Sequence, residues 1–435
     1  MTAPVFALVD CNNFFVSCER VFQPQVWHKP VVVLSNNDGC IVSRSNEAKA
    51  MGIPMGAPLH EYRDVLNKHG AVVFSSNYQL YGDMSNRVMA ILQGAVPEIE
   101  VYSIDEAFMK LSSLPPVKHT DDYTHYCLRV RQQVFQWTGI PTSIGIAPTK
   151  TLAKVASHMV KKTPGRSVIN LCSTEAQVAA LARLEVEDLW GISYRFGMRL
   201  RKLGIGTALQ LREADPKFIR KHFGVVGERI VLELQGTSCL DLGQAAKKKS
   251  ITASRSFGKL IRSKEEIKEA VCNHTARAAE KLRSQGSAAH GFCVYIRTNH
   301  LRRQAPQYRA SKMVGFDIAT NDTAELLKAA SALVDEIYRP GFNYKKAGVF
   351  MCELVPQHHQ QGHLFTTFPD EEAKQKAEKI MNCMDALNKR MGPGTLGFLA
   401  QGLRRKKGTP SDWKMRCQTR SDRFTTQWTE LLKVT

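Results

Sequence analysis

Short apolar runs alternate with helical patterns along the first part of the chain. The run Val5–Val9 has strand character, and FFVSCERVF after it has the apolar spacing of a helix. Val31–Leu34 is a continuous buried-strand run. Ser143–Gly165 reads as a strand, a turn and a helix that Thr163-Pro164-Gly165 brings to an end. This alternation predicts an α/β fold with a mixed or antiparallel sheet.

The stretch VYSIDEAF, Val101–Phe108, places two acids between two runs of strand character. Asp105 and Glu106 would then lie at the tip of a tight hairpin. The tip can be a solvated turn, in which Asp is common. It can also be a metal site, because two carboxylates about 4 Å apart repel by roughly 4 kcal/mol unless water, a proton or a cation intervenes. The pattern alone leaves both interpretations open.

Helical segments dominate from about Ala176, and strands return after a polar stretch. Leu189–Ile205 has a Gly-Ile turn at each end of a basic helix, which resembles a helix–hairpin–helix element. GQAAKKKS at 243–250 has the composition of a linker. Beyond it, strands and an amphipathic helix predict a second, smaller α/β domain over about Ile251–Val355.

The composition of the chain indicates which kind of molecule it binds. The chain has 435 residues, 43% of them hydrophobic, and a formal net charge of +20, which favours an anionic partner such as nucleic acid over a membrane surface. It contains no apolar run of about 18 residues that would span a bilayer. The 11 cysteines form no Cys-x-x-Cys pair, so we expect reduced thiols in the cytoplasm rather than a disulfide framework or structural zinc. QHHQQGH at 357–363 is interpreted as an exposed loop rather than a metal site.

Several long motifs occur in order along the chain. They are DCNNFF at 10–15, SNNDGCIVSRSNEAKAMGIPMG at 35–56, SSNYQLYGDMSNRV at 75–88, YSIDEAF at 102–108 and RSDRFTTQW at 420–428. These motifs resemble those of the Y-family translesion DNA polymerases, most of all the UmuC-type catalytic subunits of bacterial DNA polymerase V. The resemblance implies a right-hand polymerase with a ferredoxin-like palm, small fingers, a helical thumb with a helix–hairpin–helix, and a separate α/β little finger. It places the palm at 1–15 and 77–170, the fingers at 16–76, the thumb at 171–242, the linker at 243–250, the little finger at 251–355, and a tail for clamp and partner binding at 356–435.

The resemblance also gives the paired acids a chemical role. It implies error-prone, template-directed addition of dNTPs to a primer 3′-hydroxyl, past damaged template bases, in the SOS response. Asp10, Asp105 and Glu106 would be the catalytic carboxylates and would bind two Mg²⁺ ions together with the backbone carbonyl of Cys11. The alternative for Asp10 is the N-cap of the helix before Phe14.

Nucleotide contacts follow from the same motifs. Phe15 would be the steric gate against ribonucleotides, and Phe14 beside it is expected among the nucleotide-binding residues, with its ring in the core. Lys49 and Lys161 would grip the triphosphate, whereas Lys154 would be a weaker DNA contact. The remaining expected nucleotide contacts are Asn46, where many relatives carry Tyr, and the roof over the new base pair formed by Cys40, Ile41 and Val42.

The resemblance further implies partners beyond primer-template DNA and dNTP. QGHLF resembles a peptide that binds the β sliding clamp through Gln361, Leu364 and Phe365. A UmuD′-type dimer and the RecA filament are implied by the family alone, and the expected location is the bacterial cytoplasm and nucleoid, without a membrane. Two alternatives stay open at this point: a nucleotidyl cyclase, and a non-catalytic DNA-binding scaffold that recruits other polymerases. The basic thumb and little finger disfavour the first, and the intact acid set disfavours the second.

Overall fold

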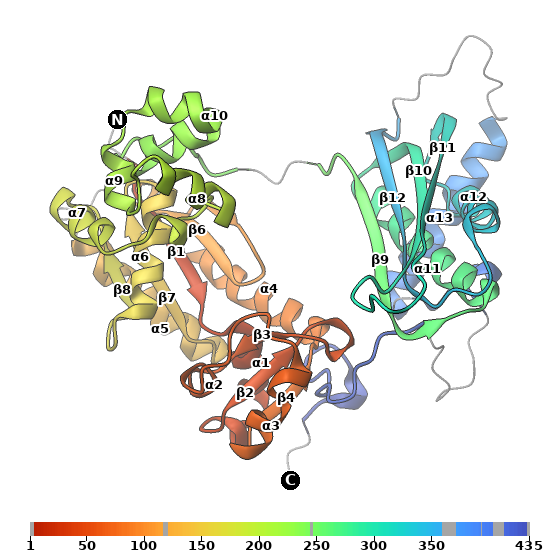
Figure 1. The fold of residues 1–435 in the computed structure, drawn as a ribbon, viewed down its shortest axis with the longest axis horizontal. Coiled ribbons are helices and arrows are strands. Elements are labelled where there is room, and N and C mark those ends of the chain that lie inside the picture. The colour runs from red at the N-terminus through yellow and green to blue at the C-terminus, as the bar shows by residue number, and fades with distance from the viewer. Residues whose placement is uncertain are drawn as a thin grey trace. The chain divides into compact units, whose positions relative to one another are not determined.

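The structure is a computed structural model that describes residues 4–115, 121–243, 247–358, 371–392, 394–402 and 413–432. Its chain forms two compact units, which are coloured along the sequence in Figure 1. The first unit comprises Met1–Ala245 together with Gln418–Thr435, and the second comprises Ala246–Cys417. The chain therefore passes between the units twice, at 245/246 and again at 417/418.

A five-stranded sheet forms the centre of the first unit. Its order is β5 (Ile99–Val101), β6 (Glu106–Lys110), β1 (Phe6–Cys11), β7 (Thr142–Ala147) and β8 (Val168–Asn170). All pairs are antiparallel except β7–β8, which is parallel. The sequence prediction of an α/β fold with a mixed sheet is confirmed.

The alternation of side chains along β1 explains why helices cover both faces of this sheet. Ala7 and Val9 face the core shared with α4 (Tyr78–Ala95) and α5 (Asp121–Thr138). Phe6 and Leu8 face the core shared with α6 (Lys150–Lys162). Because both faces are covered, every residue of β1 is buried.

Helix α6 approaches the sheet unusually closely at Gly145 of β7. A Cβ at this position would lie 2.2 Å from the backbone nitrogen of Ser157 and 2.4 Å from the carbonyl oxygen of Ala153. Only glycine leaves room for this contact of helix and strand. The close approach fixes the distance between α6 and the neighbouring strand β1.

A three-stranded sheet, in the order β3–β2–β4, forms the part of this unit that follows α1 (Phe14–Phe22). Strand β2 (Val31–Leu34) pairs antiparallel with β3 (Ile41–Arg44) and parallel with β4 (Val72–Ser75). Helices α2 (Asn46–Ala50) and α3 (Leu59–Lys68) lie between β3 and β4 in the sequence. The four residues of β2 are buried, as the continuous apolar run predicts.

Four helices, α7 to α10, form the last part of the first unit before the crossing. They are α7 (Thr174–Ala182), α8 (Tyr194–Lys202), α9 (Ala208–Glu213) and α10 (Pro216–Leu234). Helix α8 is the predicted basic helix: Ser193 caps it, and glycines with positive φ, Gly191 and Gly204, flank it. The sequence did not reveal a second break at Gly224, where φ of 73° interrupts α10.

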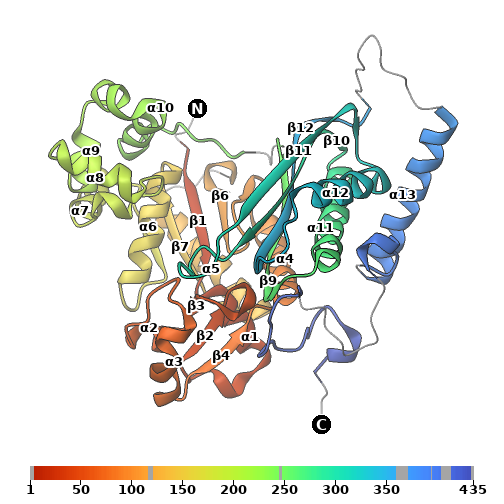
Figure 2. The ribbon, with the colours of Figure 1, turned by 45° about the vertical axis from the view of Figure 1, so that its right-hand side comes forward.

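The second unit packs two helices against a four-stranded antiparallel sheet. Its elements are β9 (Ile251–Ile261), α11 (Lys264–Ser284), β10 (Ser287–Thr298), β11 (Arg309–Thr320), α12 (Thr323–Ile337) and β12 (Tyr344–Pro356), with the sheet order β11–β10–β12–β9. Figure 2 shows α11 and α12 side by side against this sheet. Residues from both helices and from β9, β10 and β12 share one apolar core.

The chain after β12 adds further contacts to each unit. Helix α13 (Glu371–Met391) is joined to α11 by the ion pair between Asp385 and Arg283, at 2.7 Å. Trp413 contacts the core of the second unit and donates its indole N–H to Glu269, whereas Trp428 is 90% exposed. Short 3₁₀ turns lie at Pro24–Val26, Asn36–Asp38, Leu111–Ser113, Val186–Asp188, Leu399–Gln401 and Trp428–Glu430. Among the residues described, no helix has the length and hydropathy needed to cross a bilayer.

Candidate active site

Strands β1 and β6 bring the three predicted acids together. Asp10, near the end of β1, lies directly opposite Glu106, the first residue of β6, in the antiparallel register. The backbone N–H of Cys11 donates to the carbonyl oxygen of Asp105 at 2.8 Å. Acids that are far apart along the chain therefore meet at one end of the central sheet.

Two lysines of α6 balance the charge of these acids. The Lys161 ammonium lies 2.6 Å from Asp10 Oδ2, and the Lys154 ammonium lies 3.0 Å from both carboxylate oxygens of Glu106. Burial raises the pKa of Asp10 to about 6, and Lys161 only partly opposes this effect, while the neighbouring Glu106 adds to it. Lys154 thus contacts an acid directly in this structure, in addition to lying over the Tyr102 ring at 4.7 Å.

The third acid is held by its own loop. Ser103 donates its hydroxyl to Asp105 Oδ1 at 2.6 Å, and its oxygen accepts the backbone N–H of Asp105 at 3.3 Å. Cys11 is buried, and burial followed by the charges of Asp10 and Asp105 raises the pKa of its thiol well above the usual value. A neutral thiol is a poor ligand for a hard cation, so the backbone carbonyl is the group of Cys11 suited to Mg²⁺.

The donor set fits a divalent cation. In the part of the chain that the structure describes, no three His, Cys, Asp or Glu side chains are already gathered closely enough to hold a metal ion. Carboxylate oxygens are nevertheless the ligands that Mg²⁺ prefers. The pKa of Asp10 is raised chiefly by burial and to a smaller extent by the neighbouring Glu106, so added positive charge is favoured beside this carboxylate.

Two phenylalanines, Phe14 and Phe15, begin helix α1 shortly after Asp10 and Cys11. Phe14 is buried in the core at 3% exposure, as expected. Phe15 is half-buried and stacks on Tyr81, with ring centroids 4.5 Å apart and an interplanar angle of 14°. Tyr78 packs edge-on against Phe15 at 6.1 Å. The Phe15 ring is therefore supported from two sides by residues of α4.

A hydrogen-bonded chain connects three polar residues near this ring. The Lys49 ammonium donates to Asn13 Oδ1 at 2.5 Å, and Asn13 Nδ2 donates to Asn46 Oδ1 at 3.0 Å. Asn13 adopts the left-handed conformation, with φ of 48°. Burial lowers the pKa of Lys49, and the charges of Arg44 and Lys161 act in the same direction. Asn46 and Lys49 are thus brought together, and Asn13 is the residue that links them.

The expected roof residues have different environments. Ile41 is fully buried in a core with Val32 and Leu34. Cys40 and Val42 are only partly buried. Gln361, Leu364 and Phe365, the expected clamp-binding residues, lie outside the described residues.

Sequence reasoning missed the residues that position this site. They are Asn13, Ser103 and Tyr81, which contact Lys49, Asp105 and Phe15 respectively. Each lies inside a motif that was quoted for other residues. Their closeness to the functional residues along the chain was the available signal, but the direction of a side chain depends on packing.

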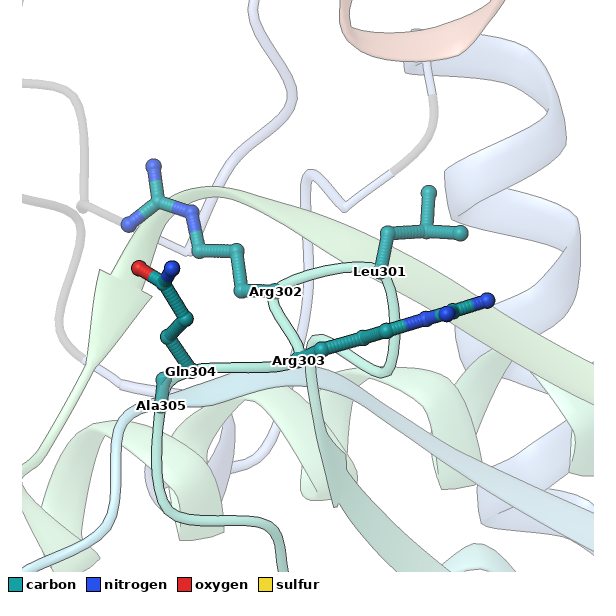
Figure 3. Close-up of a pocket in the computed structure, with 5 residues that line it drawn as sticks. All are labelled: Leu301, Arg302, Arg303, Gln304 and Ala305. Carbon is teal, nitrogen blue, oxygen red and sulfur yellow. The ribbon is translucent and has the colours of Figure 1, made fainter.

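Basic residues also gather in the second unit. The loop between β10 and β11 includes Leu301–Ala305, which line a surface hollow. Figure 3 shows Arg302 and Arg303 extending to different sides of this loop. A second hollow is lined by Lys259, Arg302, Lys345 and Arg416 among others. Such a concentration of positive charge suits a phosphate backbone.

Three family models match parts of the chain. The impB/mucB/samB family matches residues 9–158, its C-terminal domain matches residues 248–364, and a domain of unknown function matches residues 378–434. The chain is 41% identical to Protein UmuC of Salmonella typhimurium strain LT2, over 99% of this chain and 100% of that protein. The chain belongs to the impB/mucB/samB family. It is also 38% identical to Protein ImpB of Salmonella typhimurium, over 98% of this chain and 99% of that protein.

More distant relatives extend the impB/mucB/samB assignment to the Y-family polymerases. DNA polymerase IV of Desulfatibacillum aliphaticivorans is 26% identical over 91% of this chain and 96% of its own length. A solved Y-family DNA polymerase chimera, Dbh-Dpo4-Dbh, superposes with a TM-score of 0.63 at 22% identity, covering 81% of this chain and 99% of that chain, which supports the fold. The protein is a Y-family, error-prone translesion DNA polymerase.

Proposed function

We propose that Asp10, Asp105 and Glu106 are the catalytic carboxylates of this polymerase. The observation that carries the proposal is the register of β1 and β6, which sets Asp10 opposite Glu106 and bonds Cys11 to Asp105. These three acids and the carbonyl of Cys11 would hold two Mg²⁺ ions. When bound, Mg²⁺ lowers the pKa of the primer 3′-hydroxyl and offsets the charge of the triphosphate and the leaving pyrophosphate.

The surrounding residues prepare the acids for this role. Lys161 and Lys154 compensate the charge of Asp10 and Glu106 before substrate arrives. Ser103 holds the Asp105 carboxylate in one orientation through its hydroxyl. Lys49 and Lys161 would then bind the triphosphate. The hydrogen bonds from Lys49 to Asn13 and from Asn13 to Asn46 would position the Lys49 ammonium.

Phe15 would select the sugar. Its ring is fixed by Tyr81 and Tyr78, so a 2′-hydroxyl that meets the ring cannot be accommodated by a small movement. Cys40, Ile41 and Val42 would form the roof over the base pair, and of the three only Ile41 is fully buried. A roof of small side chains tests base-pair shape weakly, which allows a damaged template base to fit and lowers fidelity.

The domain roles and partners belong to the same proposal. The assignment comprises the palm at 1–15 and 77–170, the fingers at 16–76, the thumb at 171–242, the linker at 243–250, the little finger at 251–355 and a clamp- and partner-binding tail from 356. The basic loop around Arg302 and the net charge of +20 support a role of the little finger in holding DNA. Binding of the β clamp through Gln361, Leu364 and Phe365, of a UmuD′-type dimer and of the RecA filament rests on the family resemblance, as does the cytoplasmic location.

Replacement of Asp105 by Asn tests the catalytic assignment. The substitution keeps the size of the side chain and removes its charge, so we expect primer extension to fall by roughly a hundredfold or more. Binding of primer-template DNA, measured by fluorescence anisotropy, should remain because the basic surfaces are unchanged.

Asp83→Asn is the matched control, because Asp83 pairs with Arg87 on the surface of α4. This variant should extend primers like the wild type. Equal extension by Asp105→Asn and the wild type would refute the catalytic role. Undiminished bypass of a damaged template by Asp105→Asn in the presence of other polymerases would favour the scaffold alternative.

A further inference from the structure

The final segment of the chain packs on the first unit, and we name residues 418–430 the C-terminal latch. The backbone N–H of Ser75, at the end of β4, donates to the carbonyl oxygen of Thr419 at 3.2 Å, and the backbone N–H of Thr419 donates to the Ser75 hydroxyl oxygen at 3.1 Å. The Phe424 ring stacks on Phe22 of α1 at 5.0 Å with an interplanar angle of 11°. Phe424 is 9% exposed, so this ring of the latch is part of the unit's core.

Ser421 joins the latch to two helices of the first unit. Asn77, which also caps α4, donates its Nδ2 to Ser421 Oγ at 3.0 Å, to the Ser421 carbonyl at 3.2 Å and to the Asp422 carbonyl at 3.0 Å. Ser421 in turn donates its hydroxyl to Glu19 Oε1 at 3.0 Å. The latch therefore contacts both α1 and the start of α4.

Glu19 is a fully buried acid whose side-chain partners are all neutral. Its carboxyl group accepts from Tyr81 Oη at 2.6 Å, from Ser421 Oγ at 3.0 Å and from Gln23 Nε2 at 3.3 Å. A buried acid is costly unless its oxygens are satisfied. Loss of the Ser421 donor would therefore force the remaining partners to rearrange around Glu19.

The partner that matters for function is Tyr81. Its hydroxyl is bonded to Glu19, and its ring supports the Phe15 ring at 4.5 Å. Tyr81 is fully buried, so Glu19 and the packing around the ring determine its position. An unbroken set of contacts thus runs from Ser421 through Glu19 and Tyr81 to Phe15.

We propose that the C-terminal latch is a positioning element of the nucleotide site, which sets the Phe15 ring through the contacts Ser421–Glu19–Tyr81. This gives a role to part of the matched domain of unknown function, residues 378–434. The inference rests on the proposed gating role of Phe15. Ser421, Glu19 and Tyr81 are positioning residues that do not touch the substrate.

Single-nucleotide incorporation with dNTP and with the matching rNTP tests the inference on the full chain. Ser421→Ala removes the hydroxyl donor to Glu19, and Tyr81→Phe removes the phenol donor while keeping the ring. We expect each variant to lower the ratio of kcat/KM for dNTP over kcat/KM for rNTP by roughly threefold to tenfold. Because both act through Glu19, the double variant should lose no more than the larger single loss.

Two further variants separate positioning from simple stabilisation. Ser421→Thr keeps the hydroxyl and should restore most of the selectivity ratio. Trp428→Ala changes an exposed residue of the same latch and should leave the ratio at the wild-type value. A merely structural role of the latch would lower both kcat/KM values together and leave their ratio unchanged.

Phe15→Ala distinguishes failure of the inference from failure of the gate. A collapse of the ratio in Phe15→Ala, with Ser421→Ala and Tyr81→Phe within twofold of the wild type, would overturn the latch proposal alone. An unchanged ratio in Phe15→Ala would overturn the gate assignment and the latch proposal with it. Equal losses in Ser421→Ala and Trp428→Ala would also refute the positioning role.

Discussion

At the level of single residues, Glu19 couples its protonation to folding. Burial raises its pKa from 4.5 to about 7, and hydrogen bonds from Tyr81, Ser421 and Gln23 only partly oppose this. Below the pKa of the unfolded state, Glu19 is neutral in both states and its burial carries no charge penalty. As pH rises towards the folded pKa, the unfolded state ionises first, so stability is lost across the window from about 4.5 to 7.

Replacement of Glu19 by Gln should remove this part of the pH dependence. Relative to Glu19→Gln, the wild type should lose about 2 kcal/mol of unfolding free energy between about pH 5 and about pH 7.5. Urea unfolding followed by tryptophan fluorescence at the two pH values measures the difference. Parallel pH dependences of the two proteins would contradict the prediction.

The residues of the site differed in how far they could be predicted. The pairing of Asp10 with the Asp105–Glu106 tip could be anticipated, because strand ends and a hairpin tip have few possible positions. Ser103 and Asn13 could not, because their roles depend on the direction of one side chain. The contact of Lys154 with Glu106 also required the structure, since helix spacing alone left Lys154 free to face DNA.

Among the elements, α6 has the largest influence on the site because it carries both Lys154 and Lys161. Its first turn is held by Glu233 of α10, which is fully buried. The Glu233 carboxylate accepts the backbone N–H groups of Thr151, Cys239 and Leu240 at 3.0, 2.7 and 3.1 Å. A carboxylate at a helix N-terminus accepts backbone N–H groups that have no partner within the helix, and its negative charge interacts favourably with the positive end of the helix dipole.

Glu233→Gln should destabilise the protein, because the new amide group points a donor at backbone donors. We expect a loss of about 2 kcal/mol in unfolding free energy, measured by chemical denaturation. Glu228→Gln on the same helix is the control, since it breaks only the surface pair with Arg220 and should cost less than about 1 kcal/mol. Equal stability of the Glu233→Gln variant and the wild type would show that this cap is dispensable.

The sequence predicted most elements, and those it missed have a common reason. The apolar runs of β1 and β2 and the basic helix α8 were found from periodicity and glycine positions. The break at Gly224 was missed because the apolar pattern continues through it and positive φ is not a property of composition. The packing of the latch was missed because the motif RSDRFTTQW indicates the family but not which residues it contacts.

At the scale of the whole molecule, the two units are connected by the chain at two places. The first unit is completed by residues 418–435, which follow the second unit in sequence. The sequence predicted a second α/β domain after the linker, but a return of the chain cannot be inferred from the order of elements. Long-range pairs such as Asn77–Ser421 are visible only in the folded chain.

A protease site inserted into the linker at 243–250 tests this connectivity. After cleavage, the two fragments should co-elute in size-exclusion chromatography, because the second fragment carries the latch that packs on the first. The same cleavage in a chain that ends at Cys417 should release two separate fragments. Separation of the fragments in the full-length protein would contradict the packing of residues 418–430.

The close contact at Gly145 affects the electrostatics around the acids. Any side chain there would lift α6 off the sheet, and with it both ammonium groups that face the acids. Coulomb energy between such charges varies inversely with their separation, so a displacement of an ångström would change the acidity of Asp10. The absence of a methyl group at this position of the strand thereby helps to set the pKa of Asp10.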